Sequence, residues 1–153
     1  MDCILDSNIK QVGWQDVLTE QMYCGGSIYS EGVVITAAHC CDGILVNDEL
    51  WELSTEIIAG ELSVLETSGY EQSSSIKNYT IHPEYNKTTV QNDVCILYLE
   101  TPFDLTGKMA KSIELAKEDP QVGTTCDISG WGTLEVCTIV WHSLVHYRNN
   151  LEP

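Results

Sequence analysis

The sequence predicts an all-β protein, organised as an antiparallel barrel or sandwich. Helical periodicity is scarce, short runs rich in β-branched and aromatic residues recur along the chain, and turn-forming clusters separate those runs. The chain has 153 residues, of which 43% are hydrophobic and 20% charged, the balance of an ordinary folded domain. One hydrophobic core is the starting expectation for this length.

The predicted strands follow one another through the first hundred residues. They are SIYS (27–30), GVVIT (32–36), EIIAG (56–60), SIKNYTI (75–81) and VCILYL (94–99). A single helical turn is expected in AAHCCDG (37–43), at the end of the second run. The segment 102–120 lacks strand alternation and has a proline at each end, so it is interpreted as a linker before a further strand in TTCDISGWGT (124–133).

Charge excludes two classes of partner. With 23 acidic and 7 basic residues, the formal net charge is −16, which repels nucleic acid and anionic membrane surfaces. A strongly acidic surface also has the simpler effect of keeping a protein soluble. No stretch approaches the roughly 18 apolar residues that a membrane-spanning helix needs. Neither nucleic acid nor membrane is therefore expected as a partner.

Cysteine usage predicts an oxidising, extracellular setting. Seven cysteines are present, and no pair has the C-x-x-C spacing of a zinc or redox site. Two glycosylation sequons, at Asn78 and Asn86, favour the same setting. The first residues show no signal-peptide pattern. The odd cysteine count leaves at least one thiol without a partner in the chain.

His39 and Asp93 are candidates for paired chemistry. His39 has three readings: a structural histidine, a zinc ligand together with Cys24, Cys40 and Cys41, or a catalytic base. Asp93 opens an apolar strand, where it is either a turn residue or a carboxylate paired with an imidazole N–H. A base with its orienting carboxylate is what nucleophilic hydrolysis by a serine requires.

Four motifs follow one another along the chain: CGGSIYSEGVVITAAHC (24–40), NDVCILYL (92–99), PFDLTGKMAKSIEL (102–115) and CDISGWGT (126–133). This order resembles the trypsin and chymotrypsin family of serine endopeptidases, particularly the acidic digestive trypsins of invertebrates. The resemblance implies that His39 is the general base, that Asp93 orients it, and that Cys24 and Cys40 form a disulfide. It also implies that Cys126 is unpaired.

The resemblance further implies a domain plan. Members of the family fold as two antiparallel barrels. We expect a complete first barrel over 12–101, the linker over 102–120, and a fragment of a second barrel followed by an unrelated tail over 121–153.

A family member is expected to be a secreted monomer that requires no cofactor, acts on protein or peptide substrates and binds protease inhibitors. Calcium is a possible structural ligand, because Glu61 and Glu71 lie at the two ends of the loop that binds it in related trypsins. A solvated acidic loop explains the same glutamates without a metal.

The sequence departs from the family in one respect that affects function. The block GDSGGP, which carries the nucleophilic serine, does not occur in these 153 residues, and no IVGG-like start is present. We therefore expect a fragment of a serine endopeptidase, truncated at both ends and inactive by itself. The alternative is a catalytically inactive serine protease homologue that acts as a binding module.

Overall fold

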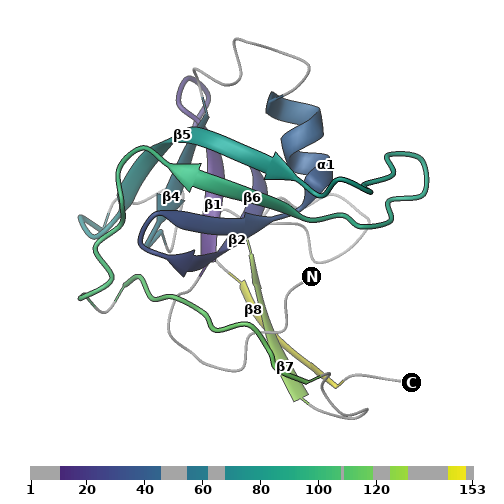
Figure 1. Ribbon diagram of the computed structural model, residues 1–153. Helices are drawn as coiled ribbons and strands as arrows, with labels where there is room; N and C mark the ends of the chain where they lie inside the picture. The colour runs from purple at the N-terminus through teal and green to yellow at the C-terminus, as the bar shows by residue number, and fades with distance from the viewer. Residues whose placement is uncertain are drawn as a thin grey trace.

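The computed structural model describes residues 11–45, 55–61, 68–107, 109–118, 125–130 and 145–150. Six antiparallel strands close into a barrel in the order β1-β2-β3-β6-β5-β4, so the prediction of an all-β fold is confirmed (Figure 1). Closure pairs every barrel strand on both sides, which satisfies its backbone hydrogen bonds. The strands are β1 (Gln11–Asp16), β2 (Met22–Ser30), β3 (Val33–Thr36), β4 (Thr55–Ala59), β5 (Gln72–Ile81) and β6 (Cys95–Leu99).

Strand β1 was not among the predicted runs. A glycine and several polar residues interrupt its apolar pattern, leaving Val12 and Trp14 as its only large hydrophobic residues. Both side chains are fully buried. The strand forms because it is paired on both sides, with Val12 opposite Gly26 of β2 and Ala59 of β4. Tertiary pairing therefore decides a strand that its own sequence indicates weakly.

The barrel interior is filled by alternate residues of the strands. Trp14, Ile28, Val34, Ile57 and Leu97 are fully buried in one cluster. Removing side chains of this size from water stabilises the fold by about 1.5–3 kcal/mol each, before the entropy of ordering the chain is subtracted. The core thus provides a rigid support for the strand ends.

Gly26 lies where β2 comes close to its neighbours. A Cβ atom at this position would lie 2.9 Å from the carbonyl oxygen of Ile35 and 2.9 Å from Cγ1 of Val34. We expect Gly26→Ala to lower the free energy of unfolding by about 2–3 kcal/mol, because a backbone atom of β3 must move. The adjacent Gly25→Ala is the control, since the nearest atom there is 3.4 Å away. Urea unfolding of both variants measures the difference, and equal losses would contradict this explanation.

A short helical segment follows β3. It comprises α1 (Ala38–Cys40) and the π-helical η1 (Cys41–Leu45), and is longer than the single turn that the sequence predicted. Ala38, Cys40 and Cys41 are buried against the barrel, whereas His39 is exposed. The buried residues thus hold the segment against the barrel, while His39 is exposed to solvent.

A separate two-stranded antiparallel sheet pairs β7 (Thr125–Gly130) with β8 (Val145–Asn150). β7 falls within the strand predicted at 124–133, and β8 lies in the tail that shows no family resemblance. The side chain of Cys126, expected to be unpaired, lies outside the described residues.

None of the helices in the described residues combines the length and apolar character needed to cross a membrane.

Candidate active site

The barrel topology brings His39 and Asp93 to the same place. β3 and β6 are antiparallel neighbours, with Thr36 at the end of β3 opposite Cys95 at the start of β6. His39 lies in α1, directly after β3, and Asp93 lies just before β6. Two residues that are 54 positions apart in the sequence therefore meet at one end of the barrel.

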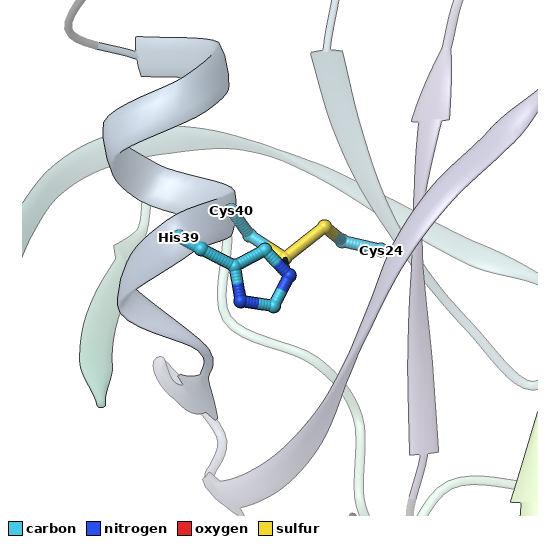
Figure 2. Close-up of side chains that lie close together, drawn as sticks. All are labelled: Cys24, His39 and Cys40. Carbon is cyan, nitrogen blue, oxygen red and sulfur yellow. Dashed lines mark hydrogen bonds between the residues drawn. A yellow bond between two sulfur atoms is a disulfide. The ribbon is translucent and has the colours of Figure 1, made fainter. Parts of the chain in front are cut away.

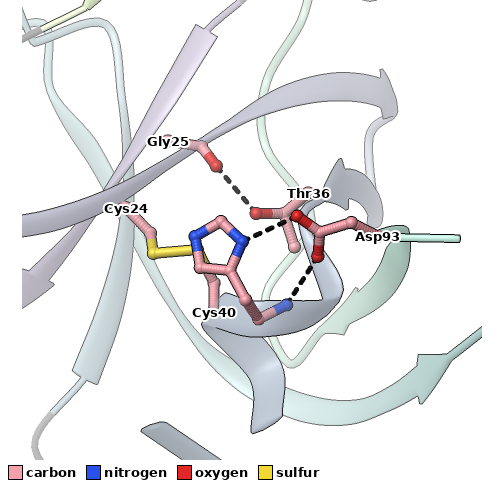
Figure 3. Close-up of polar contacts among 6 residues, drawn as sticks. Cys24, Gly25, Thr36, Cys40 and Asp93 are labelled. Carbon is pink, nitrogen blue, oxygen red and sulfur yellow. Dashed lines mark hydrogen bonds and ion pairs between the residues drawn. A yellow bond between two sulfur atoms is a disulfide. The ribbon is translucent and has the colours of Figure 1, made fainter. Parts of the chain in front are cut away.

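Asp93 contacts His39 through both of its carboxylate oxygens (Figure 3). Oδ2 lies 2.7 Å from Nδ1 of the imidazole, and Oδ1 accepts a hydrogen bond of 2.7 Å from the backbone N–H of His39. The second bond joins the carboxylate to the backbone of α1. Asp93 therefore holds both the ring of His39 and the backbone that carries it. Of the readings left open by the sequence, the imidazole–carboxylate pair is the one that this geometry favours.

The electrostatics of the pair define where the ring proton lies. Burial raises the pKa of Asp93, but hydrogen bonds from the His39 ring and from the backbone of His39 and Ala38 outweigh it, so the pKa lies below its usual range. Asp93 is therefore ionised at neutral pH and can only accept hydrogen bonds. Nδ1 of a neutral His39 must then carry the proton, which leaves Nε2 with a free lone pair.

The side chain of His39 is 59% exposed, and that of Asp93 is 22% exposed. The carboxylate is thus largely covered, while the imidazole faces solvent.

A disulfide between Cys24 and Cys40 lies beside the imidazole (Figure 2), with Sγ of Cys40 3.5 Å from Nε2 of His39. It joins β2 to α1 across a Cα–Cα distance of 6.3 Å. Next to it, the hydroxyl of Thr36 donates to the carbonyl oxygen of Gly25 at 2.7 Å, which ties β3 to β2. These links fix the position of the residue that carries the base.

The zinc alternative is wrong. Cys24 and Cys40 are bonded to each other, and Cys41 is bonded to Cys95. A sulfur in a disulfide offers no thiolate to a metal. His39 is left as the only one of the four proposed ligands with a free donor atom.

The Cys41–Cys95 disulfide was not predicted from the sequence. Both cysteines are fully buried, with a Cα–Cα distance of 6.6 Å. A signal was present: Cys41 follows His39 by two positions and Cys95 follows Asp93 by two, so both pairs have a separation of 54. Residues that flank an expected contact are themselves expected to be close.

The possible calcium ligands Glu61 and Glu71 are both described, with the residues 62–67 between them outside the description. Both oxygens of Glu71 already accept hydrogen bonds: Oε1 from the N–H and hydroxyl of Ser68, each at 2.6 Å, and Oε2 from the N–H of Gly69 at 2.8 Å. Glu61 is buried. Glu71 thus makes its contacts within its own loop, and calcium binding by Glu61 and Glu71 stays a prediction.

Glu71 gives the loop a pH-dependent stability. The hydrogen bond from the Ser68 hydroxyl, with others from the backbone, lowers the pKa of Glu71 from 4.5 to about 2. A lowered folded-state pKa stabilises the fold above the unfolded-state value, and this stabilisation is lost as the pH falls toward 2.

We expect Glu71→Gln to lower the free energy of unfolding at pH 7 by on the order of 1 kcal/mol, after allowing for solvent screening. The loss should disappear near pH 2. Urea unfolding at both pH values measures it, with the exposed Glu118→Gln as the control. A loss that is the same at pH 2 and pH 7 would mean that the charge of Glu71 is not responsible.

Comparison with known families shows the family of the chain. The family model described as Trypsin matches residues 5–150. The chain belongs to the trypsin family. The prediction made from the motif order is therefore confirmed at the level of the family, whereas the roles of individual site residues stay predictions.

The relatives that this trypsin-family chain matches include proteins named trypsin. It is 34% identical to trypsin V-A of Rattus norvegicus over 112 residues, which is 73% of the chain and 41% of the relative. It is 33% identical to trypsin of Sarcophaga bullata over 135 residues (87% and 48%). It is 35% identical to hypodermin-A of Hypoderma lineatum over 134 residues (84% and 47%). The chain thus spans less than half the length of these curated relatives.

Proposed function

We propose that this trypsin-family chain supplies the general-base half of a serine-type endopeptidase, with His39 as the base and Asp93 as the residue that orients it. The observation that carries the proposal is the 2.7 Å contact between Nδ1 of His39 and Oδ2 of Asp93, on an imidazole that faces solvent. A purely structural role does not require that the ring be exposed and held by a largely covered carboxylate.

The proposed reaction is hydrolysis of a peptide bond. Nε2 of His39 takes the proton from a serine hydroxyl as that oxygen attacks the carbonyl carbon, and later gives the proton to the leaving amine. Asp93 keeps Nδ1 protonated and stabilises the imidazolium that forms in between. The serine and the oxyanion-binding amides belong to a part of the family fold that the sequence motifs of this chain do not include.

The family and the fold support a set of further assignments. Protein or peptide substrates follow from a peptidase role, and macromolecular protease inhibitors are expected to recognise the same face. We propose that the protein is secreted and acts as a monomer; the two disulfides in the described residues support an oxidising compartment. No step of the proposed chemistry depends on calcium.

We expect the 153-residue chain by itself to show no hydrolysis of peptide esters above a His39→Ala control, because the GDSGGP block that carries the family's nucleophilic serine does not occur in these 153 residues. The assay uses a panel of basic and aromatic esters on chain that was folded under oxidising conditions. Turnover by the chain that His39→Ala abolishes would contradict the prediction and would require a nucleophile from elsewhere in the sequence.

A second candidate is an inactive homologue that binds substrates or inhibitors, and it applies only if the gene encodes no GDSGGP block. Sequencing the transcript beyond the codon for Pro153 separates the two. A GDSGGP block in frame supports the endopeptidase. Its absence, together with capture of macromolecular protease inhibitors by the chain but not by a folded variant in which His39 is alanine, supports the binding module.

A further inference from the structure

Two bridges connect the segment that carries the base to the loop that carries the carboxylate or to the strand β6 that directly follows it. We call residues 38–45 the base segment and residues 82–93 the carboxylate loop. The first bridge is the Cys41–Cys95 disulfide, which leaves the base segment two residues after His39 and reaches β6 two residues after Asp93. Both sulfur-bearing side chains are fully buried, so this bridge is anchored in the core.

The second bridge is an ion pair on the surface. Nζ of Lys87, in the carboxylate loop, lies 2.5 Å from Oδ2 of Asp42, the residue next to Cys41. The hydrogen bond and the charge of Asp42 raise the pKa of Lys87 above its usual value, so the lysine is charged at neutral pH. The side chain of Lys87 is 69% exposed, and exposed ion pairs contribute little. The disulfide is therefore the stronger of the two bridges.

The carboxylate loop is otherwise held mainly by its own hydrogen bonds. The N–H of His82 donates to the carbonyl oxygen of Val94, that of Asn86 to Gln91, and the side-chain amide of Asn92 donates to the carbonyl oxygen of Glu84. These bonds shape the loop but do not connect it to the base segment. The hydrogen bonds of Asp93 and the two bridges do reach the base segment.

The two hydrogen bonds of Asp93 hold the ring and the backbone of His39, but both depend on the distance between the carboxylate loop and the base segment. The imidazole is more than half exposed, so water competes for Nδ1. In a free neutral imidazole, either ring nitrogen can carry the proton. A displacement of about 1 Å between loop and segment would turn a hydrogen bond of 2.7 Å into none. Fixing the relative position of the two backbones removes that freedom.

We propose that Cys41 and Cys95 are positioning residues: their disulfide, assisted by the Asp42–Lys87 ion pair, holds Asp93 against His39 and thereby keeps the ring proton on Nδ1. The inference rests on the proposed function, since a lone pair on Nε2 matters only for a base. It assigns to this disulfide a role different from that of Cys24–Cys40, which joins the base segment to β2 rather than to the carboxylate.

The test is the tautomer of His39, measured by two-bond ¹H–¹⁵N correlation spectra of labelled chain, with His39→Ala used to assign the signals. We expect the Nδ1–H form in the unaltered chain. In the double variant Cys41→Ala/Cys95→Ala we expect the Nδ1–H population to fall at least about two-fold toward the value in Asp93→Asn. The comparison variant, Cys24→Ala/Cys40→Ala, loses the disulfide that joins α1 to β2 and does not reach the Asp93 side, so it should lower the Nδ1–H population less.

Circular dichroism and cooperative urea unfolding first establish that each variant is folded. A folded Cys41→Ala/Cys95→Ala variant with an unchanged tautomer overturns the proposal, as does an equal change in the comparison variant. If the double variant does not fold, Lys87→Ala tests the exposed bridge, with a smaller shift in the same direction expected and an unchanged tautomer counting against it. The tautomer can be measured without any peptidase activity. Failure of the endopeptidase assignment and failure of this proposal can therefore be told apart.

Discussion

Asp93→Asn is expected to lower kcat about 10⁴-fold in any product of this gene that also carries the nucleophilic serine, a magnitude established for the serine-protease triad. The asparagine amide can donate a hydrogen bond to Nδ1, which moves the ring proton to Nε2. An Nε2 that already carries a proton cannot accept one from the serine hydroxyl. The base would remain in place in the wrong tautomer.

The measurement is kcat for a peptide ester near pH 7.5, compared with the unaltered enzyme. Asp104→Asn is the matched control: that carboxylate accepts hydrogen bonds from Thr106 and has no contact with His39 in the described residues. We expect the control to retain kcat within about two-fold. A loss of less than ten-fold in Asp93→Asn would show that the carboxylate contributes little to the base.

Removing the Cys41–Cys95 disulfide is expected to produce the largest change in stability. The bridge closes a loop with a sequence separation of 54, and the chain-entropy relation gives about 4 kcal/mol for a loop of that length. The Cys24–Cys40 bridge, with a separation of 16, is expected to give about 3 kcal/mol. Each double alanine variant also loses buried sulfur contacts, which adds to both values.

Urea unfolding of the two double variants measures both losses in the same buffer. Because small domains have total stabilities of about 5–15 kcal/mol, either loss is a large fraction of the whole. The expected order is a greater loss for Cys41→Ala/Cys95→Ala. The reverse order would mean that native-state packing around the sulfur atoms, rather than loop length, determines the contribution.

The parts of the fold that could be predicted from sequence are those in which local pattern and tertiary packing agree. The apolar run Val33–Thr36 and its partner Cys95–Leu99 are both strands, because β-branched and large apolar residues fit a buried sheet. Gln11–Asp16 was missed because its pairing with two neighbours, rather than its composition, makes it a strand. The π-helical extension of the base segment had no local signal.

The sequence alone suggested the two residues of the candidate site, but not the contacts that hold them in place. Motif order identified His39 and Asp93, and the register of β3 with β6 explains why they meet. Which cysteines pair cannot be deduced from their number alone, so Cys41–Cys95 could be found only by reasoning that neighbours of a contacting pair are themselves close. The hydrogen bonds from Ser68 and Gly69 to Glu71 depend on loop geometry, which the sequence of an acidic loop does not specify.

The position of the Cys41–Cys95 disulfide determines what happens when the backbone between the two cysteines is cut. Its two ends enclose the whole interval from Asp42 to Val94, while His39 and Asp93 lie next to its two attachment points. A single cleavage between Asp42 and Asn92 would therefore yield two polypeptides, one bearing the imidazole and the other the carboxylate, that remain covalently joined beside the contact they share. A two-chain form of the molecule can therefore keep the contact between His39 and Asp93.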